Sequence, residues 1–464
     1  MTIRLYDSKA QSLRDFVPRV EGQVGIYVCG PTVQSSPHIG HLRSALAYDV
    51  MRRWFTYRGY QVTVIRNVTD IDDKVLQLAG DEEWWARAYR IELEFTAGYQ
   101  TLDIAPPTYE PRATASVMQM QELIASLIER GHAYPALDGS GDVYFDTASW
   151  PTYGELTRQS RANMEPATDA DPRGKRDPRD FALWKGRKSD EPASASWASP
   201  WGAGRPGWHI ECSAMAHRYL GEAFDIHGGG LDLRFPHHEN ELAQSTAAGH
   251  AFATYWVHNG LVQVNGQKMS KSLGNSVFAA DLFASATPLA VRYLLTQAHY
   301  RTNFDLTDTS LAEAQAAVDR IATVLARAER EGVAAAAAEV PSRFAAAMDD
   351  DLGVPSALAV LHETVRAANL ALDAGDASAA ATAVAELAAM LNVLGINPAD
   401  AHWSVGDAGP AHQALDVLIT GLLEARSRAR EQRDWARADE IRDSLAAAGV
   451  QIEDGAAGSH WSLA

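Results

Sequence analysis

A strand–helix–strand pattern near the start of the chain limits the fold more than any other feature. Gln23–Val28 is a short apolar run, Leu42–Tyr57 has helical periodicity with one apolar face, and Gln61–Asn67 is rich in β-branched residues. Two strands joined through a helix lie parallel in one sheet, and such sheets bind ligands at the carboxyl ends of their strands. We therefore expect an α/β fold whose ligand-binding edge includes Cys29 to His41.

The sheet is predicted to resume after a long interruption. Met118–Arg130 has a helical pattern and Asp142–Asp146 a strand pattern, whereas Arg158–Pro206 is dense in Pro, Gly, Ser and charge and predicts a loop-rich insertion. Phe224–His227 returns to a strand pattern, and His237–Gly249 to a helical pattern that stops at a glycine.

The last third of the chain is predicted to be helical. Alanine-rich segments with helical periodicity indicate a bundle, and they are Leu311–Glu331, Ser356–Ala374 and Ala377–Leu394. A small tail domain follows, with a helix over Trp435–Ala448 behind an Asp434 N-cap. The predicted domains are residues 1–120 (first half of the α/β domain), 121–206 (connective insertion), 207–310 (second half of the α/β domain), 311–405 (helical bundle) and 406–464 (tail).

Composition excludes a mainly disordered chain, because 46% of the 464 residues are hydrophobic and 22% are charged. Met1 to Gln11 is polar, and no later run approaches the roughly 18 apolar residues that span a bilayer, so we expect a cytoplasmic protein with no membrane partner. A net charge of −18 repels nucleic acid at long range, so any RNA contact requires a local basic patch.

Two short motifs suit a nucleotide. Pro37–His41 stands at a helix start, where His38 and His41 share one face and can donate to phosphate oxygens, and Gly40 allows close backbone approach. Further along, Lys268 and Lys271 stand three residues apart in a polar loop that can close over a triphosphate and neutralise charge. Taken alone, the first motif can arise by chance, and the second is more typical of a solvated surface turn.

The order of these motifs resembles that of the class I aminoacyl-tRNA synthetases, and five further segments resemble the cysteinyl-tRNA synthetases in that class. The segments are Cys29–Val33, Asn67–Lys74, Lys175–Pro178, Gly207–Met215 and Phe235–Glu241. The resemblance covers nearly the whole chain. It implies a Rossmann-like catalytic domain with a connective insertion, activation of cysteine by ATP with Mg²⁺, transfer to the terminal adenosine of tRNA(Cys), and a monomer.

A zinc site is predicted from four residues. The two cysteines of the chain, Cys29 and Cys212, are expected to flank the same end of the sheet, and a cytosolic disulfide between them is disfavoured. His237 and Glu241 are four residues apart and share a helix face, so both can point at one ion, and zinc accepts such ligands in a tetrahedron. In the resembled family these positions hold zinc, which binds the substrate thiol. The alternatives are a closed structural zinc site or two buried thiols.

The resemblance also implies roles for residues around the two small substrates. Adenosine packs against the glycine loop at Gly228 and Gly229, the ribose donates to Asp232, and Ser270 and Ser272 belong to the nucleotide-binding loop. The residues that would line the amino acid pocket are Thr69, Trp208 and His209, with a core aromatic as the alternative for Trp208.

In the tail, four arginines fall on one face if a single helix runs through them, and they lie near Trp435. These are Arg426, Arg430, Arg433 and Arg437. A basic stripe with an aromatic suits an unstacked RNA loop, while a solvated arginine face is the alternative, and the Asp434 cap would break the register. The resemblance assigns anticodon contacts to Arg430, Trp435, Asp439 and Asp454.

We interpret the chain as a cysteine-activating ligase without an editing domain, because zinc prefers a thiolate to the hydroxyl of serine. The groups that stabilise the transition state by charge are His38, His41, Lys268 and Lys271. Two rivals remain at this stage. One is a ligase of the same lineage that transfers cysteine to an amino sugar, and the other is a non-catalytic zinc- and RNA-binding relative.

Overall fold

The computed structural model describes residues 2–164, 174–269, 274–333, 336–404, 410–455 and 458–463. Contacts divide the chain into two units, Met1–Asn397 and Pro398–Ala464. This division falls shortly before the predicted start of the tail domain, and the finer five-part division stays a prediction.

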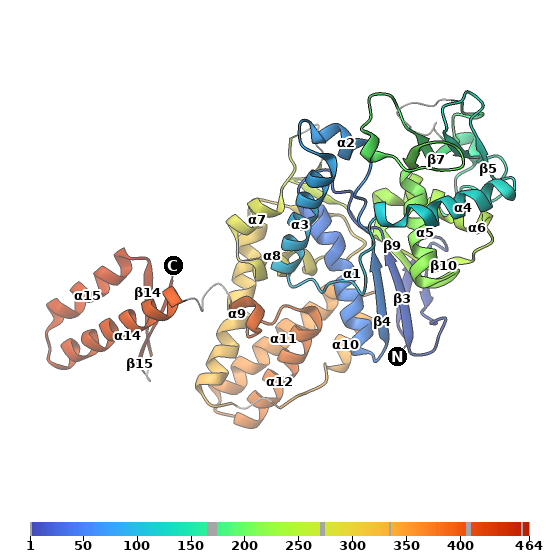
Figure 1. The fold of residues 1–464 in the computed structure, drawn as a ribbon. Coiled ribbons are helices and arrows are strands. Elements are labelled where there is room, and N and C mark those ends of the chain that lie inside the picture. Colours follow the sequence, from blue (N-terminus) through green and yellow to red (C-terminus); the bar gives the residue numbers. More distant parts are fainter. Residues whose placement is uncertain are drawn as a thin grey trace. The chain divides into compact units, whose positions relative to one another are not determined.

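A parallel sheet forms the centre of the first unit. Its described strands lie in the order β10 (Phe252–Asn259), β9 (Ala223–Gly230), β3 (Gln23–Val28) and β4 (Gln61–Arg66), and each neighbouring pair is parallel. Helices cover both faces, with α1 (Ile39–Tyr57) and α3 (Trp84–Thr101) on one side and α5 (Trp208–Leu220) on the other (Figure 1). The predicted α/β class is therefore confirmed.

Helix α1 begins three residues earlier than its apolar periodicity predicts, because histidines cap it. The Nδ1 atom of His38 accepts from the backbone N–H of Gly40 at 3.2 Å, and the Nδ1 atom of His41 accepts from that of His38 at 3.2 Å. This reciprocal capping box satisfies N–H groups that a helix start otherwise leaves without partners. Capping is a local polar effect that hydrophobic periodicity does not report.

The insertion contains more regular structure than predicted. An antiparallel sheet joins β5 (Ala133–Pro135), β6 (Val143–Phe145), β7 (Phe181–Gly186) and β8 (Gly204–Pro206), and α4 (Val117–Glu129) precedes it. The prediction of a loop-rich Arg158–Pro206 is thus wrong for β7 and β8. The apolar residues of β7 are buried. The strand is not evident in the sequence because the many Pro, Gly and charged residues on either side of it dominate the composition of the segment.

One acidic residue ties the insertion to the start of α2 (Asp73–Ala79). The Asp73 carboxylate lies 2.7 Å from Lys185 Nζ and also contacts the Arg205 guanidinium. Burial alone would raise its pKa, but these two cations lower the pKa of Asp73 to about 2. The carboxylate is therefore ionised at neutral pH, and it joins β7 and β8 to the start of α2.

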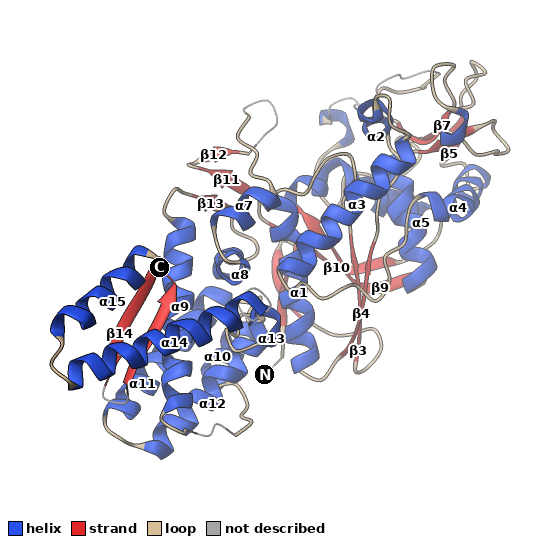
Figure 2. Ribbon diagram, turned by 60° about the vertical axis from the view of Figure 1, so that its left-hand side comes forward, coloured by secondary structure: helices blue, strands red, loops and turns tan. Residues whose placement is uncertain are grey.

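After the insertion the chain returns to the sheet edge and then forms a small separate sheet. The helix predicted from His237 begins at Glu239 as α6 (Glu239–Ala247), after one wider turn over Arg234–His238. Strand β11 (Val262–Val264) pairs with β12 (Gln267–Lys268) and with β13 (Phe304–Leu306), beside α7 (Ala279–Ser285) (Figure 2). The remaining elements of this region are the hairpin β1 (Arg4–Asp7) and β2 (Ser12–Asp15), which contacts β10, and helix α8 (Pro288–Gln297).

The predicted bundle follows as α9 (Ser310–Arg330), α10 (Ser342–Asp349), α11 (Val354–Asp373) and α12 (Ala377–Leu394) (Figure 1). Among the described helices, α12 is long and apolar enough to cross a membrane, with a mean hydropathy of 1.5, which corrects the expectation that no such run exists. Half of it is buried, and it packs against α11, α9 and α1, as a core helix of a bundle does. An alanine-rich helix of this length can be either a membrane span or a core helix of a bundle, so length and composition alone do not distinguish the two.

The second unit packs two helices on a hairpin. Helices α14 (Pro410–Glu431) and α15 (Trp435–Ala447) and strands β14 (Val450–Gly455) and β15 (Gly458–Leu463) follow the short α13 (Ala401–Ser404). Between the helices and the hairpin lies a cluster of buried apolar side chains, formed by Ile419, Leu423, Ile441, Leu445 and Val450.

The predicted arginine stripe does not form, because α14 ends before Arg433. That residue has a φ of 60°, and the Asp434 carboxylate accepts from the backbone N–H of Arg437 at 3.1 Å to begin α15. The four arginines therefore lie on two helices and the turn between them, and the predicted cap at Asp434 is confirmed.

Within the first unit, a buried arginine joins the elements round the parallel sheet to the helical bundle. Arg292 on α8 is fully buried, and its guanidinium lies 2.6 Å from Asp49 Oδ2 on α1. The same group donates to the carbonyl oxygens of Leu102 at 2.7 Å, Asp103 at 2.8 Å and Leu394 at 2.9 Å. Three segments distant in sequence thus depend on one cation.

We expect Arg292→Met to lower the free energy of unfolding of the first unit by about 3 kcal/mol, because the buried Asp49 carboxylate keeps only Arg53 as a guanidinium partner and the carbonyls of Leu102 and Leu394 lose this donor. Urea denaturation followed by tryptophan fluorescence measures this. The double variant Asp49→Asn/Arg292→Met should recover part of the loss, and Arg327→Met, which removes an exposed ion pair, serves as the control. Equal stability of Arg292→Met and the unchanged chain would contradict the role given to this cation.

Candidate active site

A cavity of about 400 Å³ lies at the carboxyl ends of the central strands. Seven residues predicted from the sequence line it, namely Cys29, His38, Gly40, His41, Trp208, Asp232 and Lys268. The cavity is lined by the loop after β3, the start of α1, the turn after β9 and the end of β12. Segments more than two hundred residues apart therefore meet where the parallel topology places a ligand.

The two histidines at the start of α1 present fixed donors to this cavity. Each uses Nδ1 to accept a backbone N–H, so each neutral ring carries its proton on Nε2. The rings stack with centroids 3.6 Å apart. Gly40 lies between them, where a Cβ atom would come within 3.1 Å of the His38 ring, so a side chain there would crowd the donors.

The lysine loop is described in part. Lys268 ends β12 and lines the cavity, and its carbonyl accepts from the Asn275 side chain at 3.3 Å. Lys271, Ser270 and Ser272 lie outside the described residues.

The glycine run after β9 divides between two environments. Gly230 lines the cavity, whereas Cβ atoms on Gly228 and Gly229 would meet the side chains of Tyr48 and His238. The predicted contact of Gly228 and Gly229 with adenosine stays a prediction.

Behind Trp208, four predicted metal ligands converge. The Sγ atoms of Cys29 and Cys212 lie 3.6 Å apart, Cys29 Sγ lies 3.3 Å from Glu241 Oε1, and His237 Nε2 lies 3.1 Å from the same oxygen. All four donor atoms fall within 4.8 Å of one another. Zinc bonds of 2.0–2.3 Å in a tetrahedron place ligand atoms about 3.3–3.8 Å apart, so the spacing fits one metal ion.

The chemistry of these donors also suits a metal ion. Burial raises the pKa of the Cys29 thiol well above its ordinary value, and Cys212 and Glu241 add to the shift. Burial and the neighbouring His209 lower the pKa of His237 well below its ordinary value. Two thiols and a neutral imidazole, packed round a buried carboxylate at the wall of the cavity, form a donor set that a dication would stabilise.

A second possible donor group overlaps the first and consists of Cys29, His227, His238 and Glu241. This second group offers zinc one thiol instead of two. One nitrogen of its His238, Nδ1, is already paired with His258 at 2.8 Å. His227 Nε2 lies 2.8 Å from Glu241 Oε2, the oxygen that faces away from His237. The sequence suggested no role for His227, whose position is typical of a residue that orients a ligating carboxylate.

The predicted amino acid pocket borders this cluster. The Trp208 ring stacks on His237 with centroids 4.2 Å apart, and His209 Nδ1 lies 2.9 Å from His237 Nδ1. Thr69 is buried and donates to Glu211 at 2.6 Å. Of these predicted residues, Trp208 reaches the cavity, while Thr69 and His209 lie in the layer behind its described lining.

One residue near the site escaped the sequence interpretation. Arg43, two positions after His41, is buried on α1 and donates to four backbone carbonyls, at Gly260, Leu261, His299 and Thr302, over distances of 2.5–3.3 Å. Burial lowers its pKa to about 10, so it stays protonated at neutral pH. The sequence feature that could have indicated a role for Arg43 is its position as a cation on an otherwise apolar helix face.

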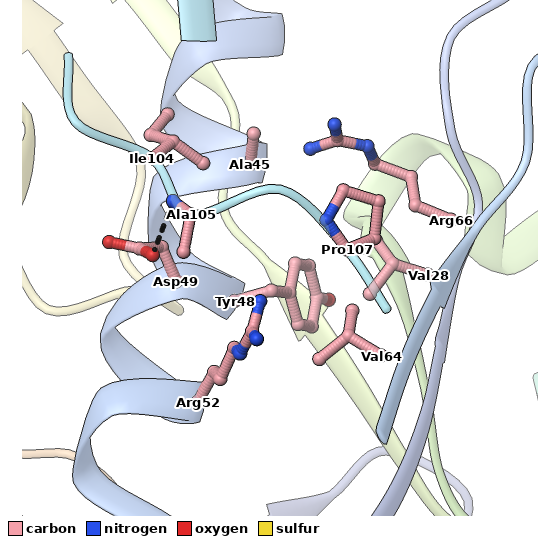
Figure 3. Close-up of a pocket in the computed structure, with 10 residues that line it drawn as sticks. All are labelled: Val28, Ala45, Tyr48, Asp49, Arg52, Val64, Arg66, Ile104, Ala105 and Pro107. Atoms are coloured by element: carbon pink, nitrogen blue, oxygen red, sulfur yellow. Dashed lines mark hydrogen bonds between the residues drawn. The ribbon is translucent and has the colours of Figure 1, made fainter. Parts of the chain in front are cut away.

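A smaller cavity beneath α1 has no room for a substrate. Tyr48, Arg52 and Pro107 are among its lining residues (Figure 3). Its volume of about 20 Å³ accommodates about one water molecule.

Comparison with known proteins gives one consistent result. Residues 15–316 match the model of the tRNA synthetases class I (C) catalytic domain, residues 343–397 that of the DALR domain, and residues 412–461 that of the cysteinyl-tRNA ligase anticodon binding domain. The chain is 66% identical to a cysteine–tRNA ligase of Clavibacter sepedonicus, over 100% of this chain and 99% of that protein. It is 64% identical to one of Leifsonia xyli subsp. xyli, over 100% of each.

Solved structures agree on the fold. Mycobacterium tuberculosis methionyl-tRNA synthetase in complex with methionyl-adenylate superposes with a TM-score of 0.57 at 17% identity, covering 81% of this chain and 90% of that one. At this identity the likeness concerns the fold alone.

We expect Cys212→Ser to lose most of the metal that the unchanged chain carries through purification and dialysis, because one of four converging donors becomes a poor ligand. Metal per chain is measured by atomic emission. Ser213→Ala, which alters the next residue but none of the four donors, should retain the metal. Full metal content in Cys212→Ser would exclude the cluster as the binding site.

Proposed function

The chain belongs to the cysteine–tRNA ligase family of class I tRNA synthetases, and we propose that it joins L-cysteine to tRNA(Cys) at the expense of ATP. The observation that carries this proposal is the cluster of Cys29, Cys212, His237 and Glu241 directly beside a nucleotide-sized cavity with histidine and lysine donors. A donor set for a thiol-binding metal next to a phosphate site matches the chemistry of cysteine activation.

In the first step the cysteine carboxylate attacks the α-phosphorus of ATP, and pyrophosphate leaves. The Nε2–H groups of His38 and His41 and the ammonium of Lys268 are placed to stabilise the charge that grows on the phosphates. Lys271, Ser270 and Ser272 are proposed to act from the same loop. Asp232 would accept from the ribose, and Mg²⁺ would accompany the triphosphate. No side chain needs to form a covalent bond.

Selection of cysteine is assigned to a zinc ion held by the four converging donors. Zinc would supply a soft Lewis acid that binds the substrate sulfur and discriminates against the oxygen of serine. Trp208 lines the cavity beside these donors, and His209 would hold Trp208 and His237 in place. Thr69 would act on Cys212 through Asn67, which contacts both residues. This selection acts before activation, so a separate editing site is not required.

In the second step a hydroxyl of the terminal adenosine of tRNA takes the cysteinyl group from the adenylate. The match of residues 412–461 to an anticodon binding domain supports tRNA as the acceptor. Arg430, Trp435 and Asp439 are the proposed anticodon contacts, with Asp454, whose side chain lies outside the described ones. We further infer a monomer that works in the cytoplasm.

A ligase that passes cysteine to an amino sugar has no use for this anticodon domain, so tRNA is the favoured acceptor. Labelled pyrophosphate exchange into ATP tests activation, and it should depend on cysteine and proceed poorly with serine. Charging of tRNA(Cys) and of an amino sugar by the same preparation then tests the acceptor. Absence of exchange with metal-loaded protein would reject the enzyme and favour a binding relative.

Arg43 is proposed as a positioning residue for the lysine loop. Its guanidinium fixes the carbonyls of Gly260 and Leu261, directly before β11, and those of His299 and Thr302, directly before β13. Since β12 pairs with β11, these bonds set where Lys268 stands relative to His41, on the same helix as Arg43.

We expect Arg43→Met to lower kcat of pyrophosphate exchange about 10- to 100-fold, the loss that follows when a charged group shifts by about 1 Å. The KM for cysteine should stay nearly unchanged, because the metal cluster lies elsewhere. Arg43→Lys should recover little, since one ammonium cannot span four carbonyls. Arg52→Met, which removes a guanidinium–carbonyl bond on the same helix away from the loop, is the matched control. A fall in thermal stability without any change in kcat would contradict the positioning role.

A further inference from the structure

A second cavity, of about 320 Å³, is lined by four aromatic side chains. Trp84, Trp85 and Tyr89 come from α3, and Trp197 comes from the insertion. The cavity therefore lies at the seam between the first half of the catalytic domain and the insertion. We call it the aromatic cavity.

Two of these aromatic side chains are exposed to solvent. Trp85 is 55% exposed and Tyr89 is 53% exposed, and they stand one helical turn apart. Trp84, in contrast, is buried and donates through Nε1 to Ser194 Oγ at 3.1 Å, which fixes α3 against the insertion. Large exposed aromatic rings beside a rigid wall are typical of a binding surface.

The charges that line this cavity disfavour a phosphate. The lining contains Asp70, Glu92 and Arg112, and the Arg112 guanidinium is engaged by Glu92 at 2.7 Å. Burial raises the pKa of Asp70, which accepts from the Thr114 hydroxyl at 2.5 Å. A flat, uncharged ring with amino groups suits such a lining better than an anion.

The aromatic cavity adjoins the nucleotide cavity. The backbone of Thr69 pairs with Pro31 and Val33, of which Pro31 lines the nucleotide cavity, and the next residue, Asp70, lines the aromatic one. Arg87 on α3 donates to the carbonyl of Gln34, which also lines the nucleotide cavity. One layer of chain thus separates the two cavities.

We propose that the aromatic cavity receives an unpaired base from the acceptor end of the tRNA, just upstream of the terminal adenosine. The inference rests on the proposed transfer to tRNA, which requires the terminal adenosine in the nucleotide cavity and its neighbours on the adjacent surface. Unpaired bases stack on aromatic side chains, and carboxylates accept from their amino groups. Trp85 provides a stacking face, Tyr89 extends it beside the Arg112 guanidinium that lies 5.7 Å over its ring, and Asp70 provides an acceptor.

The test uses the full chain and an RNA transcript. Trp85→Ala and Tyr89→Ala should each raise the KM for tRNA about 5- to 150-fold, the loss associated with one stacked base. Pyrophosphate exchange should be unchanged, because activation needs no tRNA, and Trp85→Phe should retain most of the affinity. Leu93→Ala, equally exposed one turn further along α3 but outside the cavity lining, is the matched control.

A binding measurement with shortened tRNA locates the contact. Removal of the unpaired 3′ nucleotides should weaken binding to the unchanged chain by a larger factor than binding to Trp85→Ala, since the variant has already lost one of the contacts that the shortening removes. The inference is overturned if Trp85→Ala weakens binding of full-length and shortened tRNA by the same factor, or if transfer is unaffected, as it would be were the cavity a site for a cationic peptide. Failure of exchange in the unchanged chain would instead reject the proposed function, and the binding comparison would still report on the cavity.

Discussion

The parallel pairing of β3 with β9 is the interaction on which the rest of the molecule depends. It continues one residue beyond β3, where the backbone N–H of Cys29 donates to the carbonyl of Gly228 in β9 at 3.0 Å. This register brings a thiol from the start of the chain to the segment that carries His237 and Glu241, and it aims the start of α1 at the turn after β9. A slip of this register would separate the metal donors from the histidines of α1.

Much of this architecture could be predicted from periodicity, because β3 and α12 have the residue limits that their apolar patterns indicate. The convergence of Cys29, Cys212, His237 and Glu241 was also foreseen, since thiols are rare in the chain and the other two donors are one helical turn apart. Other features depend on interactions that a linear pattern does not carry. The strand over Phe181–Gly186 was hidden by polar neighbours, the arginine stripe was broken by a single left-handed residue, and Arg43 and His227 acquire roles only through partners more than ten residues away.

Buried cations give the first unit its cohesion in a chain whose net charge is strongly negative. Arg43 and Arg292 bind carbonyl oxygens and carboxylates at the seams between elements, and Asp73 takes the opposite role between Lys185 and Arg205. The pKa of Asp73 in the folded chain, about 2, lies below the ordinary value of about 4 for an unfolded chain. Its stabilising contribution is therefore complete above about pH 4 and disappears as the pH falls toward 2.

Because of the capping box of α1, the placement of the proposed phosphate donors His38 and His41 depends on the first turn of the helix being formed. The backbone N–H groups that hold the imidazole rings of His38 and His41 belong to the first turn itself, so fraying of that turn releases both rings at once. The backbone N–H groups already select the tautomer of each histidine with the proton on Nε2. No carboxylate is needed for this, so no negative charge is added next to the proposed anionic substrate. We infer that local unfolding of this one helical turn would release both proposed phosphate donors while the rest of the protein stays folded.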